Sequence, residues 1–210
     1  MDAVVEIRHP LVQHHLCRLR DADTPSAEFR RLTRRLSILL AYEAAKDLDL
    51  TETSVQTPLT KTSARVLSQR IGLVPILRAG LGMVDPVLEL IPDAEVWHLG
   101  FYRDEKTLRP VEYYKKLPAD SAVDVALVLD PMLATGGSAV AALDAVNAWG
   151  AKTTKLLSMI AAPEGLRVVR KAFPDTQIYV CAIDDHLNEH GYIVPGLGDA
   201  GDRTFNARAV

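Results

Sequence analysis

The sequence predicts an α/β fold in which a parallel sheet carries helices on both of its faces. Short apolar runs that are typical of buried strands alternate with helical segments between residues 71 and 184. Alternation of this kind indicates parallel strands joined by helices. With 210 residues, of which 48% are hydrophobic, the chain is predicted to form one domain over residues 1–210.

In the first half of the chain we expect a long helix, then strands on either side of a shorter helix. Thr24 and Pro25 suit the N-cap and first position of the long helix. Its leucines at 32, 36, 39 and 40 form an apolar face that continues to about Lys46 and covers one face of the sheet. A short polar strand is expected near Val55. The apolar patterns then predict a buried strand over 71–77, a helix over 81–91 and an alternating strand over 95–102.

The second half of the chain repeats the alternation. Five apolar residues from Val125 predict a buried strand, and Gly150 closes a helix over residues 139–148. A glycine- and proline-rich tail begins at about Asn188, and we expect no regular element in it. Between these segments the sequence predicts a strand over 155–161, a helix over 164–173 and a strand over 178–184.

The connection between the strand from Val125 and the helix from residue 139 has the composition of a phosphate site. Asp130 follows the strand, and Thr135-Gly136-Gly137-Ser138 forms the turn before the helix. Free N–H groups and the dipole at the amino end of a helix attract anions. A sugar whose 5′-phosphate lies in this turn would bring its hydroxyls within reach of Asp130. The natural ligand is therefore a ribose 5-phosphate.

Other phosphate motifs do not match the spacing in this turn. A dinucleotide fingerprint needs G-x-G-x-x-G, and a Walker loop needs a lysine followed by serine or threonine after its last glycine. The turn therefore suits a single terminal phosphate. The alternative is an ordinary connection whose glycines serve tight packing. The aspartate, threonine and serine that accompany the glycines favour the phosphate site.

The run from Asp130 to Ser138 resembles the phosphoribosyl-diphosphate motif of type I phosphoribosyltransferases, in the one-acid form of the uracil phosphoribosyltransferase family. Segments 75–83, 100–105 and 191–203 resemble the same family in the same order, and the resemblance extends from about His9 to Phe205. It implies the fold of that family, with a hood formed by the N- and C-terminal segments. It also implies transfer of the 5-phosphoribosyl group from 5-phospho-α-D-ribose 1-diphosphate (PRPP) to uracil, which yields UMP and diphosphate.

The resemblance also assigns the site residues. It makes Asp130, Arg103 and Asp199 catalytic, with Asp130 holding ribose hydroxyls. The implied uracil contacts are Ile193, Gly198, Asp199 and Ala200. The implied PRPP contacts are Arg78, Arg103, Asp130, Pro131, Met132, Leu133, Ala134, Thr135, Gly136, Gly137, Ser138 and Asp199.

Arg78 and Arg103 each lie at the end of a predicted strand. A guanidinium stays charged and can bind diphosphate oxygens in pairs, although each arginine could instead be a solvated charge. The charged segment 104–117 follows Arg103 and shows no clear periodicity. We expect it to be a mobile lid that excludes water from the activated sugar carbon, and an exposed hairpin is the alternative.

The tail suits recognition of a small planar base. Uracil presents alternating donors and acceptors along one edge, which a turned backbone can match with its own N–H and C=O groups. The glycines of the tail permit close approach. Its apolar residues, such as Tyr192 and Ile193, argue against a frayed terminus.

Mg²⁺ is the cofactor that the resemblance implies, held mainly by PRPP and water without direct protein ligands. We expect catalysis by positioning and by stabilisation of the departing diphosphate, with no covalent intermediate and no conventional base. The family also implies a homodimer or a higher homo-oligomer, and it makes GTP a candidate activator.

Composition and charge limit the partners of the protein. Lys and Arg number 24 and Asp and Glu number 27, which gives a formal net charge of −3. The chain lacks the basic bias of many nucleic-acid-binding proteins, so we expect no nucleic-acid partner. No apolar run is long enough to span a membrane and the first residues do not resemble a signal peptide, so we expect a cytoplasmic protein without membrane contact. Cys17 and Cys181 are interpreted as small buried thiols.

Some features allow other interpretations. His186-Leu-Asn-Glu-His190 fits the H-x-x-E-H pattern of zinc peptidases, but Gly191 and Pro195 leave too little helix for such a site. Asp185 and His186 depart from the pattern of the resembled family next to the expected base site. The first rival function is a transferase of the same fold that acts on another base, or a bifunctional regulator of that fold that binds RNA. The second is a sensor that binds the sugar-phosphate donor without turnover.

Overall fold

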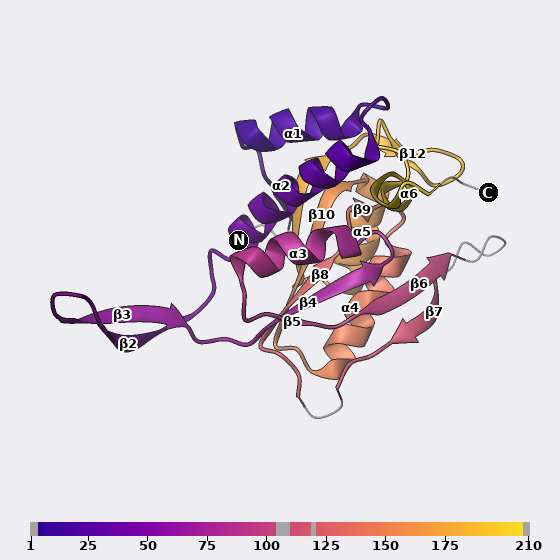
Figure 1. Cartoon of the computed structure of the whole chain (residues 1–210). Helices are drawn as coiled ribbons and strands as arrows, with labels where there is room; N and C mark the ends of the chain where they lie inside the picture. The colour runs from indigo at the N-terminus through magenta and orange to yellow at the C-terminus, as the bar shows by residue number, and fades with distance from the viewer. Residues whose placement is uncertain (1–3, 104–109, 119–120, 208–210) are drawn as a thin grey trace.

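The computed structural model describes residues 4–103, 110–118 and 121–207, and it confirms a mostly parallel sheet with helices on both faces (Figure 1). Within these residues the main sheet has nine strands in the order β1-β11-β10-β8-β4-β6-β7, with β5 beside β4 and β9 beside β10. Its strand pairs are parallel except for β6 with β7. The strands are β1 (Val4–Glu6), β4 (Ile71–Leu77), β5 (Glu95–Val96), β6 (Leu99–Arg103), β7 (Pro110–Lys115), β8 (Val125–Leu129), β9 (Met132–Leu133), β10 (Thr153–Ala161) and β11 (Gln177–Ile183).

Both faces of this sheet are covered by helices. Along β8, Leu127 and Leu129 belong to the hydrophobic cluster on one face, whereas Ala126 and Val128 belong to the cluster on the other. Strands buried on both sides need continuous apolar runs, and for this reason β4 and β8 have the bounds that the sequence predicts. The first face carries α1 (Pro10–Arg20), α2 (Ser26–Ala44) and α3 (Leu81–Leu90), and the second carries α4 (Gly137–Trp149) and α5 (Pro163–Ala172).

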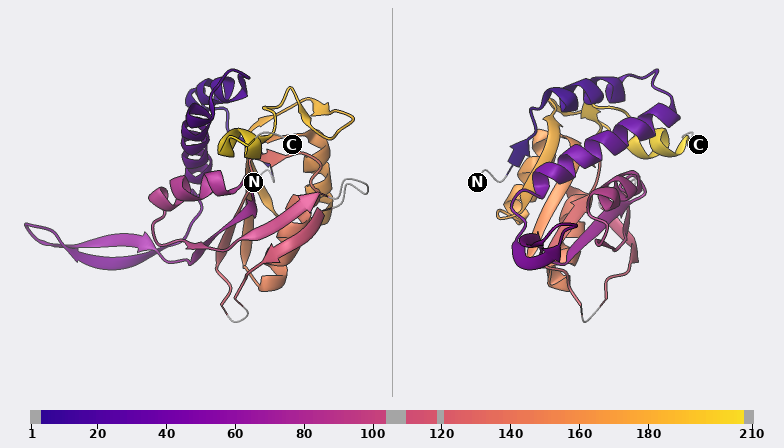
Figure 2. Two further views of the ribbon diagram at one scale, coloured as in Figure 1. Left: turned by 45° about the vertical axis from the view of Figure 1, so that its right-hand side comes forward. Right: turned by 60° about the vertical axis from the view of Figure 1, so that its left-hand side comes forward.

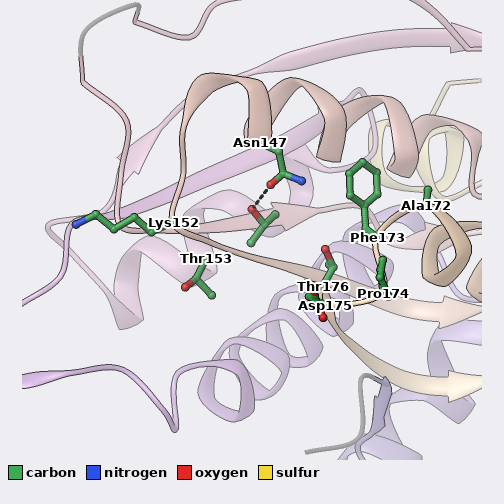
Figure 3. A pocket seen from close by; sticks show the side chains of 9 residues that line it. Asn147, Lys152, Thr153, Ala172, Phe173, Pro174, Asp175 and Thr176 are labelled. Atoms are coloured by element: carbon green, nitrogen blue, oxygen red, sulfur yellow. Dashed lines mark hydrogen bonds between the residues drawn. The ribbon is translucent and has the colours of Figure 1, made fainter.

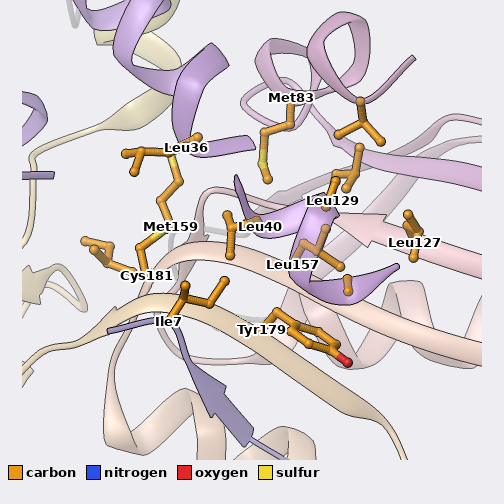
Figure 4. Packing of buried hydrophobic residues seen from close by; sticks show 14 of the residues in the cluster. Ile7, Leu36, Leu40, Met83, Leu127, Leu129, Leu157, Met159, Tyr179 and Cys181 are labelled. Atoms are coloured by element: carbon orange, nitrogen blue, oxygen red, sulfur yellow. The ribbon is translucent and has the colours of Figure 1, made fainter. Parts of the chain in front are cut away.

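The cluster under α1, α2 and α3 is the larger of the two (Figure 4). Leu36 and Leu40 of α2 and Met83 of α3 lie over the sheet, where Leu129 and Met159 meet them. Burial of leucine and methionine side chains of this kind stabilises the fold by about 1.5–3 kcal/mol each. The predicted role of the long helix as the cover of one sheet face is therefore confirmed.

The two ends of the chain meet in the predicted hood. Helices α1 and α2 lie next to the C-terminal tail at one end of the sheet (Figures 1 and 2). The Ser26 hydroxyl donates to Asn206 Oδ1 at 3.1 Å, and Arg30 donates to the carbonyl of Thr204 at 2.9 Å. The tail contains β12 (His186–Leu187), β13 (Ile193–Val194) and α6 (Ala200–Phe205).

A long antiparallel hairpin projects from the body of the protein (Figures 1 and 2). Its strands are β2 (Leu50–Gln56) and β3 (Lys61–Leu67), which pair with each other in a sheet of their own. Most side chains of both strands are exposed. The sequence predicted only a short strand near Val55, because a hairpin that leaves both faces in solvent has no buried face to produce an alternating pattern.

Three predictions near the ends of the chain are wrong. Pro25, not Thr24, is the N-cap of α2, and the Thr24 hydroxyl donates to the Arg18 carbonyl at 2.6 Å instead. The tail does hold regular elements, although each is short. Cys17 is exposed, since it lies on the solvent face of α1, a helix that the sequence did not predict; Cys181 is buried as expected.

Two further predictions concern the middle of the chain, and the first of them is wrong. The strand expected over 95–102 is divided into β5 and β6, and both pieces pair with β4. Residues 104–109 of the expected lid lie outside the described residues. Residues 110–115 form β7, antiparallel to β6, as in the hairpin alternative.

Within the described residues, none of the helices combines the length and the apolar character that crossing a membrane requires.

Candidate functional site

The motif turn lies at the carboxyl ends of the central strands. Asp130 follows β8 directly, and Gly136, with φ 83°, is the N-cap of α4. A φ of this sign suits glycine, which has no Cβ to clash. Val140 N–H donates to the Gly136 carbonyl at 2.9 Å. The N–H groups of the preceding first turn have no acceptor inside a helix, so they are available to an anion.

Neighbouring elements hold the motif turn in place. Asp130 N–H donates to the Leu157 carbonyl at 3.2 Å, and the Leu133 carbonyl accepts from Ala162 N–H at 2.9 Å. The side chains of Pro131 and Leu133 are buried. These two residues can therefore contact a ligand at most through their backbone, whereas Thr135 and Ser138 are partly exposed.

Gly165 of α5 permits the close approach of this helix to the turn. A Cβ at Gly165 would lie 2.3 Å from the Ala134 carbonyl oxygen and 2.9 Å from that of Leu133. In return, a Cβ at Gly136 would lie 2.9 Å from the Gly165 carbonyl oxygen. The backbones of α5 and of the motif turn are thus in contact. This role of Gly165 gives no signal in the sequence, because Ala134 lies some thirty residues earlier in the chain.

A cavity of about 410 Å³ joins the motif turn to the C-terminal tail. Asp130 lines it from the motif side, and all four residues that the family resemblance assigns to uracil line it from the tail side. A volume of this order suits a small molecule. The lining residues are Ala79, Asp130, Met132, Ala134, His190, Gly191, Tyr192, Ile193, Gly198, Asp199, Ala200 and Gly201.

Five of these lining residues are absent from the predicted site: Ala79, His190, Gly191, Tyr192 and Gly201. Tyr192 is the largest, and it is half exposed. Three of the five lie next to predicted residues in sequence and Gly191 lies two residues from Ile193, so a margin of two residues around the predicted site would have included these four. The fifth, His190, precedes the tail motif and gave no signal beyond the H-x-x-E-H pattern.

Arg78 lies beside the cavity, next to the lining residue Ala79. Among the described residues, its lining includes neither Arg78 nor Thr135, Gly136, Gly137 and Ser138. Arg78 follows β4 directly, its side chain is 63% exposed, and its Nη2 lies 3.5 Å from Asp202 Oδ1. Arg103 is the last residue of β6, and its side chain lies outside the described residues.

The carboxyl group of Asp130 is electrostatically unusual. The residue keeps an exposed edge towards the cavity, yet burial of its carboxyl group raises the pKa to about 7. The N–H of Met132, 3.3 Å from Asp130 Oδ1, acts in the opposite direction and lowers the pKa. A carboxylate that is poorly solvated gains more than usual from ligand hydroxyls that donate to it.

The second carboxylate of the cavity belongs to Asp199. It is exposed and caps α6, where Asp199 Oδ1 accepts from Asp202 N–H at 2.8 Å. Two carboxylates facing one cavity offer the oxygen donors that Mg²⁺ prefers. Within the described ranges, no group of three or more histidine, cysteine, aspartate or glutamate side chains could hold a metal ion. This donor set fits a magnesium ion that PRPP and water would coordinate for the most part.

The H-x-x-E-H pattern does not form a zinc-binding helix. His186 belongs to strand β12, in which Leu187 pairs with Ile193 of β13. His190 Nε2 lies 3.5 Å from Oε1 of its neighbour Glu189. The segment therefore packs locally.

A second cavity, of about 450 Å³, lies at the opposite end of the strands (Figure 3). It adjoins the amino ends of β10 and β11, where the Thr154 hydroxyl donates to Asn147 Oδ1 at 3.1 Å. Ligands of parallel α/β sheets bind at the carboxyl ends of the strands. This cavity thus has no part in the site around Asp130.

Comparison with known proteins gives one consistent family. The family described as uracil phosphoribosyltransferase matches residues 5–207. Uracil phosphoribosyltransferases of Roseiflexus sp. (strain RS-1) and Geobacillus kaustophilus (strain HTA426) are 60% and 53% identical to this chain, over 98% and 99% of its length and 99% and 100% of theirs.

Solved structures agree with this comparison. A protein structure from Aquifex aeolicus superposes with a TM-score of 0.93 and 40% identity, and the match covers 99% of both chains. A hypoxanthine-guanine phosphoribosyltransferase of Bacillus anthracis has a TM-score of 0.53 over 76% of this chain and 80% of its own. At 12% identity the latter shows a shared fold alone.

Proposed function

The chain belongs to the uracil phosphoribosyltransferase family and is a pentosyltransferase that acts on uracil, and on this basis we propose how its residues form UMP and diphosphate from uracil and PRPP. The observation that carries the proposal is the shared cavity of Asp130 and the tail. In this cavity Asp130, Met132 and Ala134, which precede the turn from Thr135 to Ser138, lie across from the backbone of the tail.

In this proposal PRPP binds along the motif. Its 5′-phosphate occupies the turn from Thr135 to Ser138 at the amino end of α4, where N–H groups and side-chain hydroxyls donate to it. The ribose hydroxyls donate to the carboxylate of Asp130. The sugar carbon C1 then points into the cavity, towards the tail.

Uracil binds against the tail between Ile193 and Ala200. The backbone of Gly198 and its neighbours matches the alternating donors and acceptors of the base, and Ile193 contacts its face. A uracil nitrogen held there attacks C1 as the bond from C1 to the diphosphate oxygen breaks, with inversion at that carbon, and the proton of that nitrogen leaves with the diphosphate. The protein contributes position and charge, and no covalent intermediate forms.

The departing diphosphate carries several negative charges, which Arg78 and Arg103 offset. Asp199 would contribute to holding magnesium on the same side through water. When bound, the metal would supply positive charge that offsets part of the charge of the leaving group. GTP is the candidate activator in this proposal, and the protein works in the cytoplasm as one domain over 1–210.

UMP formation from uracil and PRPP with magnesium tests the proposal, with cytosine, hypoxanthine and orotate as alternative acceptors and with GTP added in a parallel series. Turnover with uracil alone supports it. Turnover with another base would assign a different acceptor. Tight PRPP binding without turnover on any base would favour a sensor or regulator, and an RNA gel shift would identify the regulatory form.

Replacing Arg78 by alanine is expected to raise the KM for PRPP by about tenfold to a hundredfold, because bonds from a charged donor contribute roughly 1.5–3 kcal/mol. The KM for uracil should stay within about twofold. Since the side chain is 63% exposed, the melting temperature should not change. Initial rates over a range of PRPP concentrations measure the effect.

The KM of Arg78→Lys for PRPP should lie between those of the unmodified protein and of Arg78→Ala, because lysine keeps the charge and loses the paired geometry. An unchanged KM for PRPP in Arg78→Ala would remove Arg78 from the site.

The hairpin of β2 and β3 supports a homodimer or a higher homo-oligomer. An isolated two-stranded hairpin is marginally stable in water. This one exposes Val55 at 40% and Leu59 at 94%, together with Leu50, Val66 and Leu67. A second copy of the chain that covers these side chains would stabilise the hairpin.

Light scattering on the purified protein is therefore expected to give the mass of two or more chains. A double variant with Val55→Glu and Leu59→Glu should shift the mass towards one chain, because the apolar contact would then contain buried charges. Leu11→Glu, at an exposed leucine of α1, is the control and should leave the mass unchanged. A single-chain mass for the unmodified protein would contradict the proposal.

A further inference from the structure

Arg20 and Asp184 together bind the carbonyl and the N–H of one residue of the tail, Gly196. Arg20 ends α1 and donates to Asp184 through both terminal nitrogens, from Nη1 to Oδ2 at 2.7 Å and from Nη2 to Oδ1 at 2.5 Å. Asp184 Oδ2 accepts from Gly196 N–H at 2.9 Å, and Arg20 Nη1 donates to the Gly196 carbonyl at 2.7 Å. Both polar backbone groups of Gly196 are therefore bound to this ion pair.

This ion pair is itself fixed to the sheet. Asp184 directly follows β11, it is only 6% exposed, and its N–H donates to the Ala161 carbonyl at the end of β10 at 2.8 Å. A paired guanidinium and carboxylate with this geometry are strongly directional. Gly196 is thus located relative to the strand ends that also carry the motif turn.

Gly196 in turn sets the shape of the cavity wall. Its φ is 65°, and a Cβ there would lie 2.1 Å from the Ile193 carbonyl oxygen, so the chain turns back tightly between Ile193 and Gly198. Both of these residues line the cavity, whereas Gly196 does not. A displacement of Gly196 would therefore move both ends of the wall.

Arg203 of α6 binds Leu197, the residue that follows Gly196. Its Nη1 donates to the carbonyls of Leu197 at 2.8 Å and Leu19 at 2.9 Å, and its Nη2 donates to the Asp21 carbonyl at 2.5 Å. Its guanidinium also lies 4.5 Å from the centre of the Phe29 ring. The end of α1 is therefore bound to two successive residues of the tail by two separate arginines.

From these contacts we infer that Arg20, Asp184 and Arg203 are positioning residues for uracil, which hold the loop from Ile193 to Gly198 against the end of α1 and so set the location of the base. None of the three is among the described residues that line the cavity, so they act through the backbone of the loop. Recognition of a base edge by backbone groups depends on their exact spacing, and a small displacement is costly. The inference rests on the proposed uracil site.

Steady-state kinetics of Arg20→Lys and Arg203→Lys test this inference, because lysine keeps the charge and loses the forked geometry. Each variant is expected to raise the KM for uracil by roughly tenfold and to leave the KM for PRPP within about twofold. Arg170→Lys, at an exposed position of α5 away from the tail, is the matched control and should change neither constant.

A lowered melting temperature with an unchanged KM for uracil would show that the arginines stabilise the fold only, and would overturn the inference. An equal rise in both KM values would overturn it as well. Because the two arginines are independent, Arg203→Lys remains a test if Arg20→Lys does not fold.

Failure of the proposed function is seen separately, as absence of UMP formation by the unmodified protein. If Ile193→Ala left the KM for uracil unchanged, the base site itself would be wrong.

Discussion

Asp130→Asn is expected to lower kcat/KM for UMP formation by about a hundredfold to a thousandfold while making the folded protein more stable. Asparagine has nearly the same size, but it is neutral and replaces one acceptor oxygen by an amide. Bonds from ribose hydroxyls to a carboxylate contribute roughly 1.5–3 kcal/mol each. Asparagine keeps one acceptor oxygen, so we expect a loss of about 3–4 kcal/mol, which gives a decrease of this order.

The gain in stability follows from the raised pKa of Asp130. The carboxyl group has a pKa of about 7 in the folded protein, against an ordinary value of 3.8 for an unperturbed aspartate. Between these two values the folded state binds more protons than the unfolded state, so the free energy of unfolding decreases as pH rises from about 4 to about 7. Asparagine has no charge to desolvate. Above pH 7 the free energy of unfolding of the variant should therefore be higher than that of the unmodified protein by roughly 2 kcal/mol. This figure is reduced to allow for the exposed edge of the residue.

Thermal and urea unfolding at pH 8 and at pH 4 measure this difference, which should be present at pH 8 and nearly vanish at pH 4. Asp144→Asn, at an exposed aspartate on α4, is the matched control and should alter neither stability nor activity. A variant at Asp130 that kept full activity would exclude ribose binding by this carboxylate. Equal stability at pH 8 would show that the carboxyl group is well solvated.

Gly165→Ala is expected to destabilise the protein by about 1–2 kcal/mol and to raise the KM for PRPP by about tenfold or more. The new Cβ would lie 2.3 Å from the carbonyl oxygen of Ala134 and 2.9 Å from that of Leu133, so backbone must move. Overpacking of this kind costs about 1–3 kcal/mol, and the better helix propensity of alanine recovers at most about 1 kcal/mol. The motif turn would move with Ala134, and displacement of a binding group weakens its contacts steeply.

Gly82→Ala in α3 is the matched control for stability. Its Cβ would lie 3.4 Å from Thr204 Cγ2 and 3.5 Å from Thr33 Cγ2, which is ordinary contact. Alanine there should leave the free energy of unfolding unchanged or raise it. Urea unfolding of both variants provides the comparison. If Gly165→Ala behaved like Gly82→Ala, helix α5 would not be in close contact with the turn.

Local patterns predicted those elements whose own residues carry the signal. Strands β4 and β8 have continuous apolar runs because both of their faces are buried, and their bounds agree with the sequence. Helix α4 ends at a glycine with φ 100°, the signal that closed it in the sequence. By contrast, α1 was not predicted, because three buried residues on one face of a polar helix form a weak pattern.

The motif turn, the parallel sheet and the family of this chain were all recognisable in the sequence, because each is carried by short motifs and apolar runs whose order along the chain can be read directly. The tertiary structure alone decided which distant segments share the cavity and what supports them: Asp130 faces the tail, Gly165 supports the motif turn, and Arg20 pairs with Asp184 across 164 residues. Such contacts leave no periodic trace in the sequence, since they depend on where the whole fold places residues that are far apart along the chain.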